Sequence, residues 1–207
     1  MTAALRTVVV VDDDPAFRLS MEQFLSAAGY RPRAYPSAEA FLASPPPEGP
    51  ACVLVDLRMP GMSGLQLQEE LARAGRSCAL VFLSGHGGVK ATAQAMKGGA
   101  VDFLEKPYEE EALLEAIDRA LARDAAARAA GTERAEARAR LARLTPAERQ
   151  VCELLARGKR NKEIAAALGK SESTVKAQHW VALSKLGVSS AVELARLLGL
   201  AGPGEAP

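Results

Sequence analysis

The stretches VVVVDDDP (Val8–Pro15) and VLVDLRMPGMSG (Val53–Gly64) decide the fold of this chain. Each begins with an apolar run rich in valine and then places aspartate directly after that run. Apolar runs of this kind are typical of strands that are buried on both faces of a parallel sheet. An aspartate that follows such a strand lies at the carboxyl edge of the sheet, where α/β proteins bind their ligands.

The same alternation of short apolar runs and amphipathic stretches continues through the first 123 residues. Five strands are predicted, at Thr7–Val11, Arg31–Tyr35, Ala51–Val55, Cys78–Leu83 and Val101–Leu104. Helical patterns follow them at Pro15–Ala28, Ser37–Ala43, Gly64–Ala74, Val89–Lys97 and Glu109–Arg123. The alternation predicts a doubly wound α/β domain with a five-stranded parallel sheet. The second strand is polar, which is typical of a sheet edge.

Charge is unevenly distributed along the 207 residues. Residues 1–124 carry 12 Lys and Arg against 17 Asp and Glu, a balance of −5, whereas residues 125–142 stand at +2 and residues 143–207 at +4. We therefore predict an α/β domain over residues 1–124, a helical linker rich in Ala and Arg over 125–142, and a basic helical domain over 143–207. Within this linker, Gly131 is the one residue expected to interrupt the helix. A basic domain can approach a polyanion.

The composition disfavours several kinds of protein and site. No apolar run is long enough to span a bilayer and the N-terminus lacks the apolar centre of a secretion signal, so we expect a cytoplasmic protein without a membrane partner. Cys52, Cys78 and Cys152 have no paired spacing, and the two histidines, His86 and His179, do not complete a zinc site with them. A bound metal would therefore need oxygen ligands.

Polar side chains stand at the ends of four predicted strands. Asp12 and Asp13 follow the first strand and Asp56 the third, while Ser84 and Lys106 follow the fourth and fifth. Clustered carboxylates repel one another unless a divalent cation is present, and oxygen ligands select Mg²⁺, for which Mn²⁺ or Ca²⁺ can substitute. We predict that the three aspartates bind this ion. Asp56 would attack phosphorus, and Lys106 and Ser84 would stabilise the phosphoryl oxygens.

Four motifs, VVVVDDDP, VLVDLRMPGMSG, FLSGHGG and DFLEKP, resemble the receiver domains of two-component response regulators. The resemblance covers Arg6–Arg123 and implies a flavodoxin-like sheet with strand order 2-1-3-4-5. It implies that Asp56 is the phosphoacceptor and that the backbone carbonyl of Arg58 is a further Mg²⁺ ligand. It also implies a cis peptide bond at Lys106–Pro107.

The resemblance also places Phe103 at the aromatic switch position of these receivers. Its ring is expected to turn inward when Ser84 moves toward the phosphoryl group. Simple packing of the ring is the alternative for Phe103. For the acidic cluster, the alternative is that each aspartate only begins a turn or a helix, as Asp14 before Pro15 can do.

The stretch LTPAERQVCELLARGKRNKEIAAALGKSESTVK (Leu144–Lys176) carries repeated helix start and stop signals. Thr145 and Glu148 form a capping box around Pro146. Asn161, Ser171 and Ser190 are predicted to cap the next three helices, and Gly158, Gly169 and Gly187 to end the preceding ones. Four short helices with a tight second turn predict a helix-turn-helix.

Leu144–Leu198 resembles the LuxR-type helix-turn-helix of the FixJ and NarL class of regulators. Its recognition helix would run from Ser171 to Leu186, with Val175, Ala182 and Leu186 on the buried face. We predict DNA contacts from the outer face of this helix and from basic and hydroxyl side chains near it, at Lys159, Arg160, Lys162, Lys170, Ser173, Thr174, Lys176, Ala177, Trp180 and Lys185.

Beyond Lys176 the sequence departs from this class. It reads AQHWVALSKLG (Ala177–Gly187), where a histidine and one or two arginines are usual. Trp180 could contact thymine methyl groups, or it could pack against the linker or a dimer partner.

Together these features predict a transcriptional response regulator that a sensor histidine kinase phosphorylates. Phosphorylation would promote homodimerisation of the receiver and binding to promoter DNA, with RNA polymerase as the downstream partner. No catalysis is expected beyond its own phosphoryl transfer and slow dephosphorylation. A phosphatase of the haloacid dehalogenase type is an alternative that uses Asp12 and Asp14 but leaves Asp56 unexplained. In a second alternative, the altered helix binds a protein instead of DNA.

Overall fold

The computed structural model describes residues 6–76, 78–85 and 88–202 of the chain. The chain divides into two compact units, one ending at Arg128 and the other beginning at Ala129. Each unit has its own apolar core. The predicted domain limits at residues 124 and 142 stay predictions.

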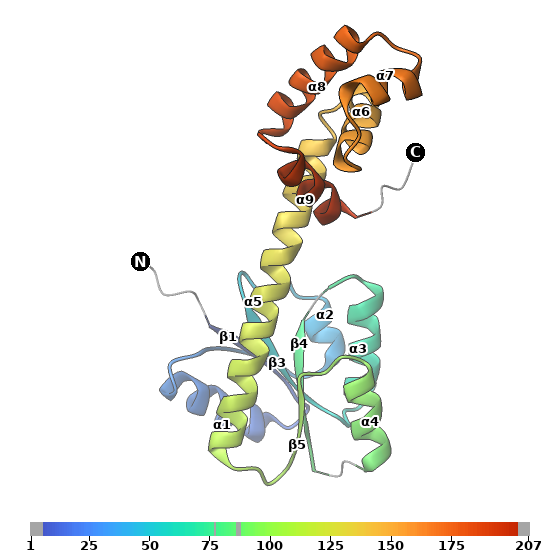
Figure 1. The fold of residues 1–207 in the computed structure, drawn as a ribbon. Helices are drawn as coiled ribbons and strands as arrows, with labels where there is room; N and C mark the ends of the chain where they lie inside the picture. The colour runs from blue at the N-terminus through green and yellow to red at the C-terminus, as the bar shows by residue number, and fades with distance from the viewer. Residues whose placement is uncertain (1–5, 77, 86–87, 203–207) are drawn as a thin grey trace. The chain divides into compact units, whose positions relative to one another are not determined.

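The N-terminal unit is built on a five-stranded sheet (Figure 1). Its strands are β1 (Thr7–Val11), β2 (Arg31–Tyr35), β3 (Ala51–Asp56), β4 (Ala79–Ser84) and β5 (Asp102–Glu105). All neighbours pair in parallel, in the order β2-β1-β3-β4-β5. The predicted strand order is confirmed, and the polar second strand is an edge. Two strands begin and end one residue later than predicted, because their last residues still pair with the neighbouring strand.

Helices cover both faces of this sheet. They are α1 (Pro15–Ala27), α2 (Ala38–Leu42), α3 (Gly64–Arg73), α4 (Val89–Lys97) and the first part of α5 (Glu110–Leu141). Val8 and Val10 of β1 pack on the side of α1 and α5, whereas Val9 and Val11 pack on the side of α2, α3 and α4. The alternation of side chains along each strand therefore supplies two cores, which is why the apolar runs are continuous.

The C-terminal unit is helical. The last turns of α5 are followed by α6 (Pro146–Ala156), α7 (Asn161–Leu168), α8 (Glu172–Leu186) and α9 (Ala191–Ala201). Thr145, Ser171 and Ser190 cap α6, α8 and α9 through their side chains, as predicted. None of the described helices has the length and apolar character needed to span a membrane.

The predicted cap at Asn161 is wrong. Arg160 is the N-cap residue of α7, and its backbone N–H donates to Glu163 Oε2 at 2.8 Å. Asn161 lies in the first turn of the helix, where its Oδ1 is 3.2 Å from Nδ1 of His179 on α8. Glu163, at the third helical position, accepts a hydrogen bond from the free N–H at the start of α7. The side chain of Asn161 is therefore available for a tertiary contact.

Gly64, the first residue of α3, permits the backbone of α3 to lie close to β3. A Cβ at this position would lie 2.5 Å from the carbonyl oxygen of Asp56 and 3.0 Å from the ring of Phe82. We expect Gly64→Ala to lower the free energy of unfolding of the N-terminal unit by about 1–3 kcal/mol, because backbone must shift to admit the methyl group. Urea unfolding, followed through the NMR amide signals of β3, measures this loss.

Gly85→Ala is the matched control, since nothing lies within 4 Å of a Cβ at Gly85. Equal destabilisation by the two substitutions would contradict the packing explanation.

Candidate functional site

The carboxyl edge of the sheet brings two aspartates and a lysine together. Asp12 lies directly after β1, Asp56 is the last residue of β3, and Lys106 follows β5. The Nζ of Lys106 lies 3.0 Å from Oδ2 of Asp12 and 3.2 Å from Oδ1 of Asp56. The Asp12 side chain is 4% exposed and the Asp56 side chain 14% exposed. One ammonium thus serves two mostly buried carboxylates.

The loops hold these side chains through backbone contacts. Asp12 Oδ1 accepts a hydrogen bond from the N–H of Asp14 at 2.9 Å, and Asp56 Oδ2 accepts one from the N–H of Arg58 at 2.7 Å. The N–H of Lys106, one residue after the end of β5, donates to the carbonyl oxygen of Ser84, the last residue of β4, at 2.8 Å. The peptide bond between Lys106 and Pro107 is cis.

The remaining predicted residues of this edge differ in exposure. Ser84 is buried at the end of β4. Asp13 is exposed and makes no hydrogen bond or ion pair with any residue in the described ranges. Phe103 is half-buried and stacks on Phe82, with ring centroids 6.1 Å apart. Asp14 caps α1 by accepting from the N–H of Ala16, so its role is structural.

The donor set at this edge suits a hard divalent cation. Asp12, Asp13 and Asp56 carry three negative charges and Lys106 carries one positive charge, which leaves a formal charge of −2. All the acidic groups offer oxygen, the ligand atom that Mg²⁺ prefers. Within residues 6–76, 78–85 and 88–202, no three His, Cys, Asp or Glu side chains are already gathered as a metal cluster.

Two contacts at this edge were not predicted from the sequence. The Nζ of Lys106 lies 3.8 Å from the centroid of the Phe17 ring, a cation–π contact from α1. Glu39 Oε1 accepts from the N–H of Met62 at 2.9 Å. The Glu39 pKa is lowered chiefly by a hydrogen bond from its own backbone N–H, then by one from the Ser37 hydroxyl, and after these by the bond from Met62. Both contacts join residues far apart in the chain, so no local pattern signals them.

In the C-terminal unit, α7, the turn at Gly169 and α8 form the predicted helix-turn-helix. Gly169 has a φ of 62°, a left-handed conformation that permits the tight turn. Val175, Ala182 and Leu186 are buried, as predicted for the inner face of α8. The outer face is solvent-exposed, at Ser173, Lys176, Ala177, Trp180 and Ser184.

Trp180 is 74% exposed on this outer face. The packing against the linker considered above is therefore not found in the part of the chain that the structure describes.

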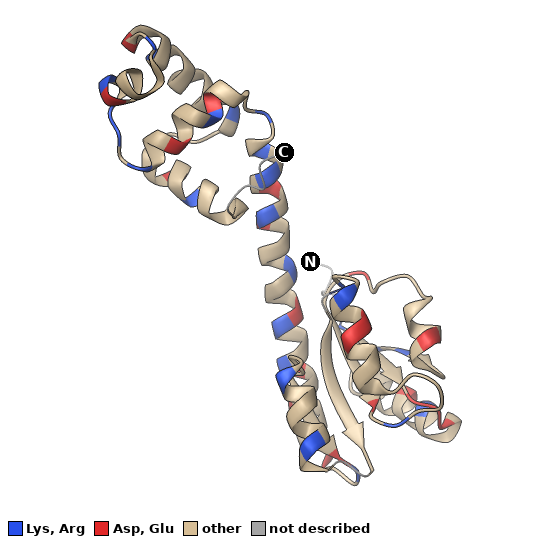
Figure 2. Cartoon of the chain, turned by 90° about the vertical axis from the view of Figure 1, so that its right-hand side faces the viewer, with Lys and Arg blue, Asp and Glu red and all other residues tan. Residues whose placement is uncertain are grey.

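Several basic residues of this unit already have partners. Lys176 pairs with Glu172 at 3.1 Å and Lys159 with Glu163 at 3.8 Å, both exposed pairs within one helix or at its start. Lys170 Nζ donates to Gln178 Oε1 at 3.1 Å. The exposed side chains of Arg160 and Lys162 face solvent beside them. Figure 2 shows Lys and Arg distributed over these helices and along α5.

Lys185 differs from the other predicted DNA contacts. Its Nζ lies 2.8 Å from both carboxylate oxygens of the buried residue Glu148. Glu148 Oε2 also accepts from the N–H of Thr145 at 2.8 Å, completing the capping box of α6. The interaction joins the start of α6 to the last turn of α8, so Lys185 contributes to the packing of the unit.

Comparison with known proteins agrees with this geometry. Residues 8–118 match the family described as the response regulator receiver domain, and residues 142–198 match the family described as bacterial regulatory proteins, luxR family. The chain is a two-component response regulator with a LuxR-type DNA-binding domain. The predicted fold and class are confirmed.

Individual relatives extend over nearly the whole regulator. It is 40% identical to the transcriptional regulatory protein FixJ of Azorhizobium caulinodans, covering 94% of this chain and 92% of that protein. Nodulation protein W of Bradyrhizobium diazoefficiens is 39% identical, over 92% of this chain and 84% of its own. Among solved structures, the response regulator StyR matches with a TM-score of 0.82 and 41% identity, covering 92% of this chain and 96% of its own.

The ion pair between Glu148 and Lys185 predicts a pH dependence. The hydrogen bond from Lys185, followed by the one from the Thr145 backbone, lowers the Glu148 pKa below its ordinary value of 4.5. The pair therefore stabilises the C-terminal unit above pH 4.5, and this stabilisation is lost as the pH falls through the lowered pKa. We expect the Tm difference between wild type and Glu148→Gln to be positive at pH 7 and to shrink below pH 4.5. Thermal unfolding monitored through Trp180 fluorescence measures it.

Glu153→Gln is the control, because Glu153 is exposed on the same helix. A Glu148→Gln difference that stays constant from pH 7 to pH 3 would contradict the ion-pair explanation.

Proposed function

We propose that Asp56 accepts a phosphoryl group and that this event controls DNA binding by the C-terminal unit. The observation that carries the proposal is the shared ammonium of Lys106, which lies within 3.2 Å of both Asp12 and Asp56. A lysine in this position neutralises part of the charge that develops on a transferring phosphoryl group. The neighbouring hydroxyl of Ser84 donates to a second phosphoryl oxygen.

The donor is a phosphohistidine of a sensor histidine kinase. A carboxylate oxygen of Asp56 attacks phosphorus, the bond between phosphorus and the imidazole nitrogen breaks, and the bonding electron pair leaves with the imidazole. Asp12, Asp13, Asp56 and the carbonyl of Arg58 would hold Mg²⁺, with Mn²⁺ or Ca²⁺ as substitutes. The ion supplies charge neutralisation for the phosphoryl oxygens. Beyond this transfer and slow hydrolysis of the acyl phosphate, the regulator performs no catalysis.

The change at Asp56 reaches the surface through Ser84 and Phe103. The Phe103 ring now stacks on Phe82. It would leave this position and turn inward when Ser84 moves toward the phosphoryl group. The face formed by α4, β5 and α5 then favours a homodimer, which presents two DNA-binding units to a promoter and to RNA polymerase.

We also propose that the regulator acts in the cytoplasm, and that its receiver, linker and DNA-binding domain comprise residues 1–124, 125–142 and 143–207.

Replacing Asp56 tests the phosphoacceptor. With acetyl phosphate and Mg²⁺, the wild type should gain one phosphoryl group, whereas Asp56→Asn should gain none, because the amide is a poor nucleophile. Intact-mass spectrometry of the full chain measures the addition. Asp14→Asn is the matched control, since asparagine also caps helices well and should leave labelling unchanged. Steady hydrolysis of small phosphoesters by Asp56→Asn would favour the phosphatase alternative instead.

DNA binding would place α8 in the major groove with Ala177 and Trp180 against base edges. Basic side chains, all exposed except the half-buried Lys170, contact phosphates together with Ser173 and Thr174: Lys159, Arg160, Lys162, Lys170 and Lys176. Lys185 acts as a positioning residue, because its charge is engaged by Glu148. Trp180 contributes apolar surface where a thymine methyl group can be covered.

The role of Trp180 predicts a dependence on thymine methyl groups. A preferred duplex is first selected from a random library with the phosphorylated regulator, and its thymines are then replaced by uracil. We expect wild type to lose affinity on the order of fourfold per contacted methyl group, which corresponds to about 0.8 kcal/mol of apolar burial. Trp180→Ala should bind both duplexes equally. Fluorescence anisotropy provides the affinities.

Val192→Ala is the matched control, since Val192 is an exposed apolar residue of α9. If Trp180→Ala keeps the full preference for thymine, Trp180 does not read the methyl group. If affinity for random duplex DNA shows almost no salt dependence, the unit binds a partner other than DNA.

A further inference from the structure

The Phe17 ring lies against the ammonium of Lys106 at the carboxyl edge of the sheet. The Nζ of Lys106 is 3.8 Å from the ring centroid, well within the roughly 6 Å over which a cation–π contact is effective. At this distance the ammonium lies over the face of the ring, where the π electrons are, and not at its hydrogen-bearing edge. Since Asp12 and Asp56 accept hydrogen bonds from the same atom, the three N–H groups of the ammonium have three partners.

Local structure fixes the ring relative to the first aspartate. Phe17 is in the first turn of α1, which begins after the cap residue Asp14. The next side chain, Arg18, turns back and donates from Nη1 to the carbonyl oxygen of Asp12 at 2.7 Å. The ring itself is half-buried and packs at the margin of the core between the sheet and the helices α1 and α5. One short segment therefore presents both a carboxylate and a ring face to Lys106.

The ammonium of Lys106 needs a neighbour that keeps it at this edge. Its side chain is 26% exposed, and the flexible four-carbon stem of a lysine can carry the charge into solvent. The ring attracts the cation on the side of α1, and it thus favours the rotamer in which Nζ reaches both carboxylates. A larger fraction of molecules then has the charge in place.

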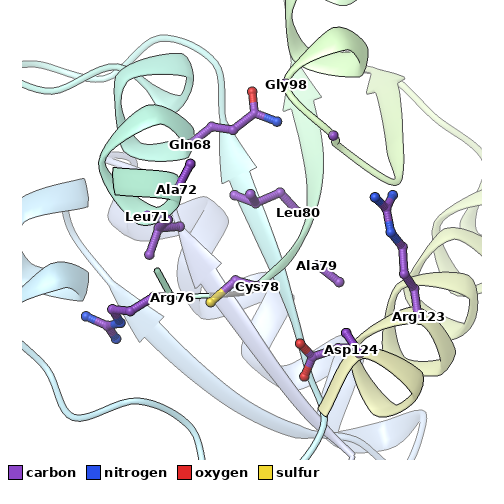
Figure 3. Close-up of a pocket in the computed structure, with 12 residues that line it drawn as sticks. Gln68, Leu71, Ala72, Arg76, Cys78, Ala79, Leu80, Gly98, Arg123 and Asp124 are labelled. Atoms are coloured by element: carbon purple, nitrogen blue, oxygen red, sulfur yellow. The ribbon is translucent and has the colours of Figure 1, made fainter. Parts of the chain in front are cut away.

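A second cation–π contact of this unit has a different setting. The Cζ of Arg76 lies 5.6 Å from the centroid of the Phe41 ring, and Nη1 donates to the carbonyl oxygen of Leu42 at 3.0 Å. Figure 3 shows Arg76 in the turn between α3 and β4, at the edge of the sheet away from Asp56. That contact joins elements of the fold, whereas the ring of Phe17 contacts the cation that serves the proposed phosphoacceptor.

We propose that Phe17 is a positioning residue for phosphoryl transfer to Asp56. This role rests on the proposed function, in which Lys106 neutralises charge on the transferring phosphoryl group. The ring holds the ammonium in place before the phosphoryl donor arrives. During the transfer Lys106 exchanges its hydrogen bond with Asp56 for one to a phosphoryl oxygen and keeps its contact with the ring, so little reorganisation is needed.

Fluorination of the ring tests this role in the full-length regulator. One, two or three ring fluorines on Phe17 withdraw electron density from the ring face and weaken its attraction for a cation, while the size of the ring changes little. With acetyl phosphate and Mg²⁺, the rate of phosphoryl addition, followed by intact-mass spectrometry, should fall with each fluorine. We expect a total loss of about fivefold, because fewer molecules have Lys106 in place.

Two further measurements separate positioning from packing. The same fluorinated series at Phe24, which is half-buried on the same helix and against the same core, should leave the rate unchanged. In the absence of acetyl phosphate, the ring current of Phe17 should shift the NMR signals of the Lys106 ε-methylene protons upfield. Phe17→Leu keeps an apolar side chain but removes the ring, so it should abolish this shift and slow phosphoryl addition at least as much as three fluorines do.

The possible outcomes distinguish this role from the proposed function. If the wild type gains a phosphoryl group but the rate is equal across the fluorinated series at Phe17, the ring only packs and does not position Lys106. An equal loss of rate in the Phe24 series, or the lack of an upfield shift in the wild type, would lead to the same conclusion. If the wild type gains no phosphoryl group at all, the assignment of Asp56 as phosphoacceptor fails, and the role of Phe17 fails with it.

Discussion

The ammonium of Lys106, shared between Asp12 and Asp56, is the interaction on which the N-terminal unit depends for its chemistry. Lys106 lies 94 residues from Asp12 and 50 residues from Asp56 along the chain. The parallel register brings them together, because Val11 pairs with Val55 and the backbone of Lys106 bonds to Ser84 at the same edge. The positive charge of Lys106 lies between the two carboxylates and reduces their mutual repulsion.

The C-terminal unit uses an ion pair for a different purpose. Lys185 reaches Glu148, which lies 37 residues away and also caps α6. This contact joins a helix start to the last turn of the recognition helix. Lys185, a predicted phosphate contact, is thereby paired with Glu148, and Trp180 is exposed on the outer face of the same helix. Under the proposed function, DNA recognition by this regulator would rely more on apolar contact than the charged residues usual in its class suggest.

A single helix, α5, contributes to the cores of both units. Leu113 and Ile117 pack against the sheet, whereas Ala137 and Leu141 belong to the core of the C-terminal unit. The helix continues through Gly131, the predicted break, because one glycine costs a helix only about 1 kcal/mol relative to alanine. Near the end of the first unit, Asp124 ties α5 to the start of β3 by accepting a hydrogen bond from the N–H of Ala51.

The sequence by itself determined the α/β class with its parallel sheet, the helix caps at Thr145, Ser171 and Ser190, and the residues at the ends of the strands. It could do so because periodicity and capping are local properties. Only the tertiary structure decided which charges meet. The pairing of Lys185 with Glu148, the contact of Asn161 with His179 and the unpaired oxygen of Asp124 depend on distances between helices and strands that are remote in the chain. Local patterns carry no information about such distances, since packing of the whole core sets them.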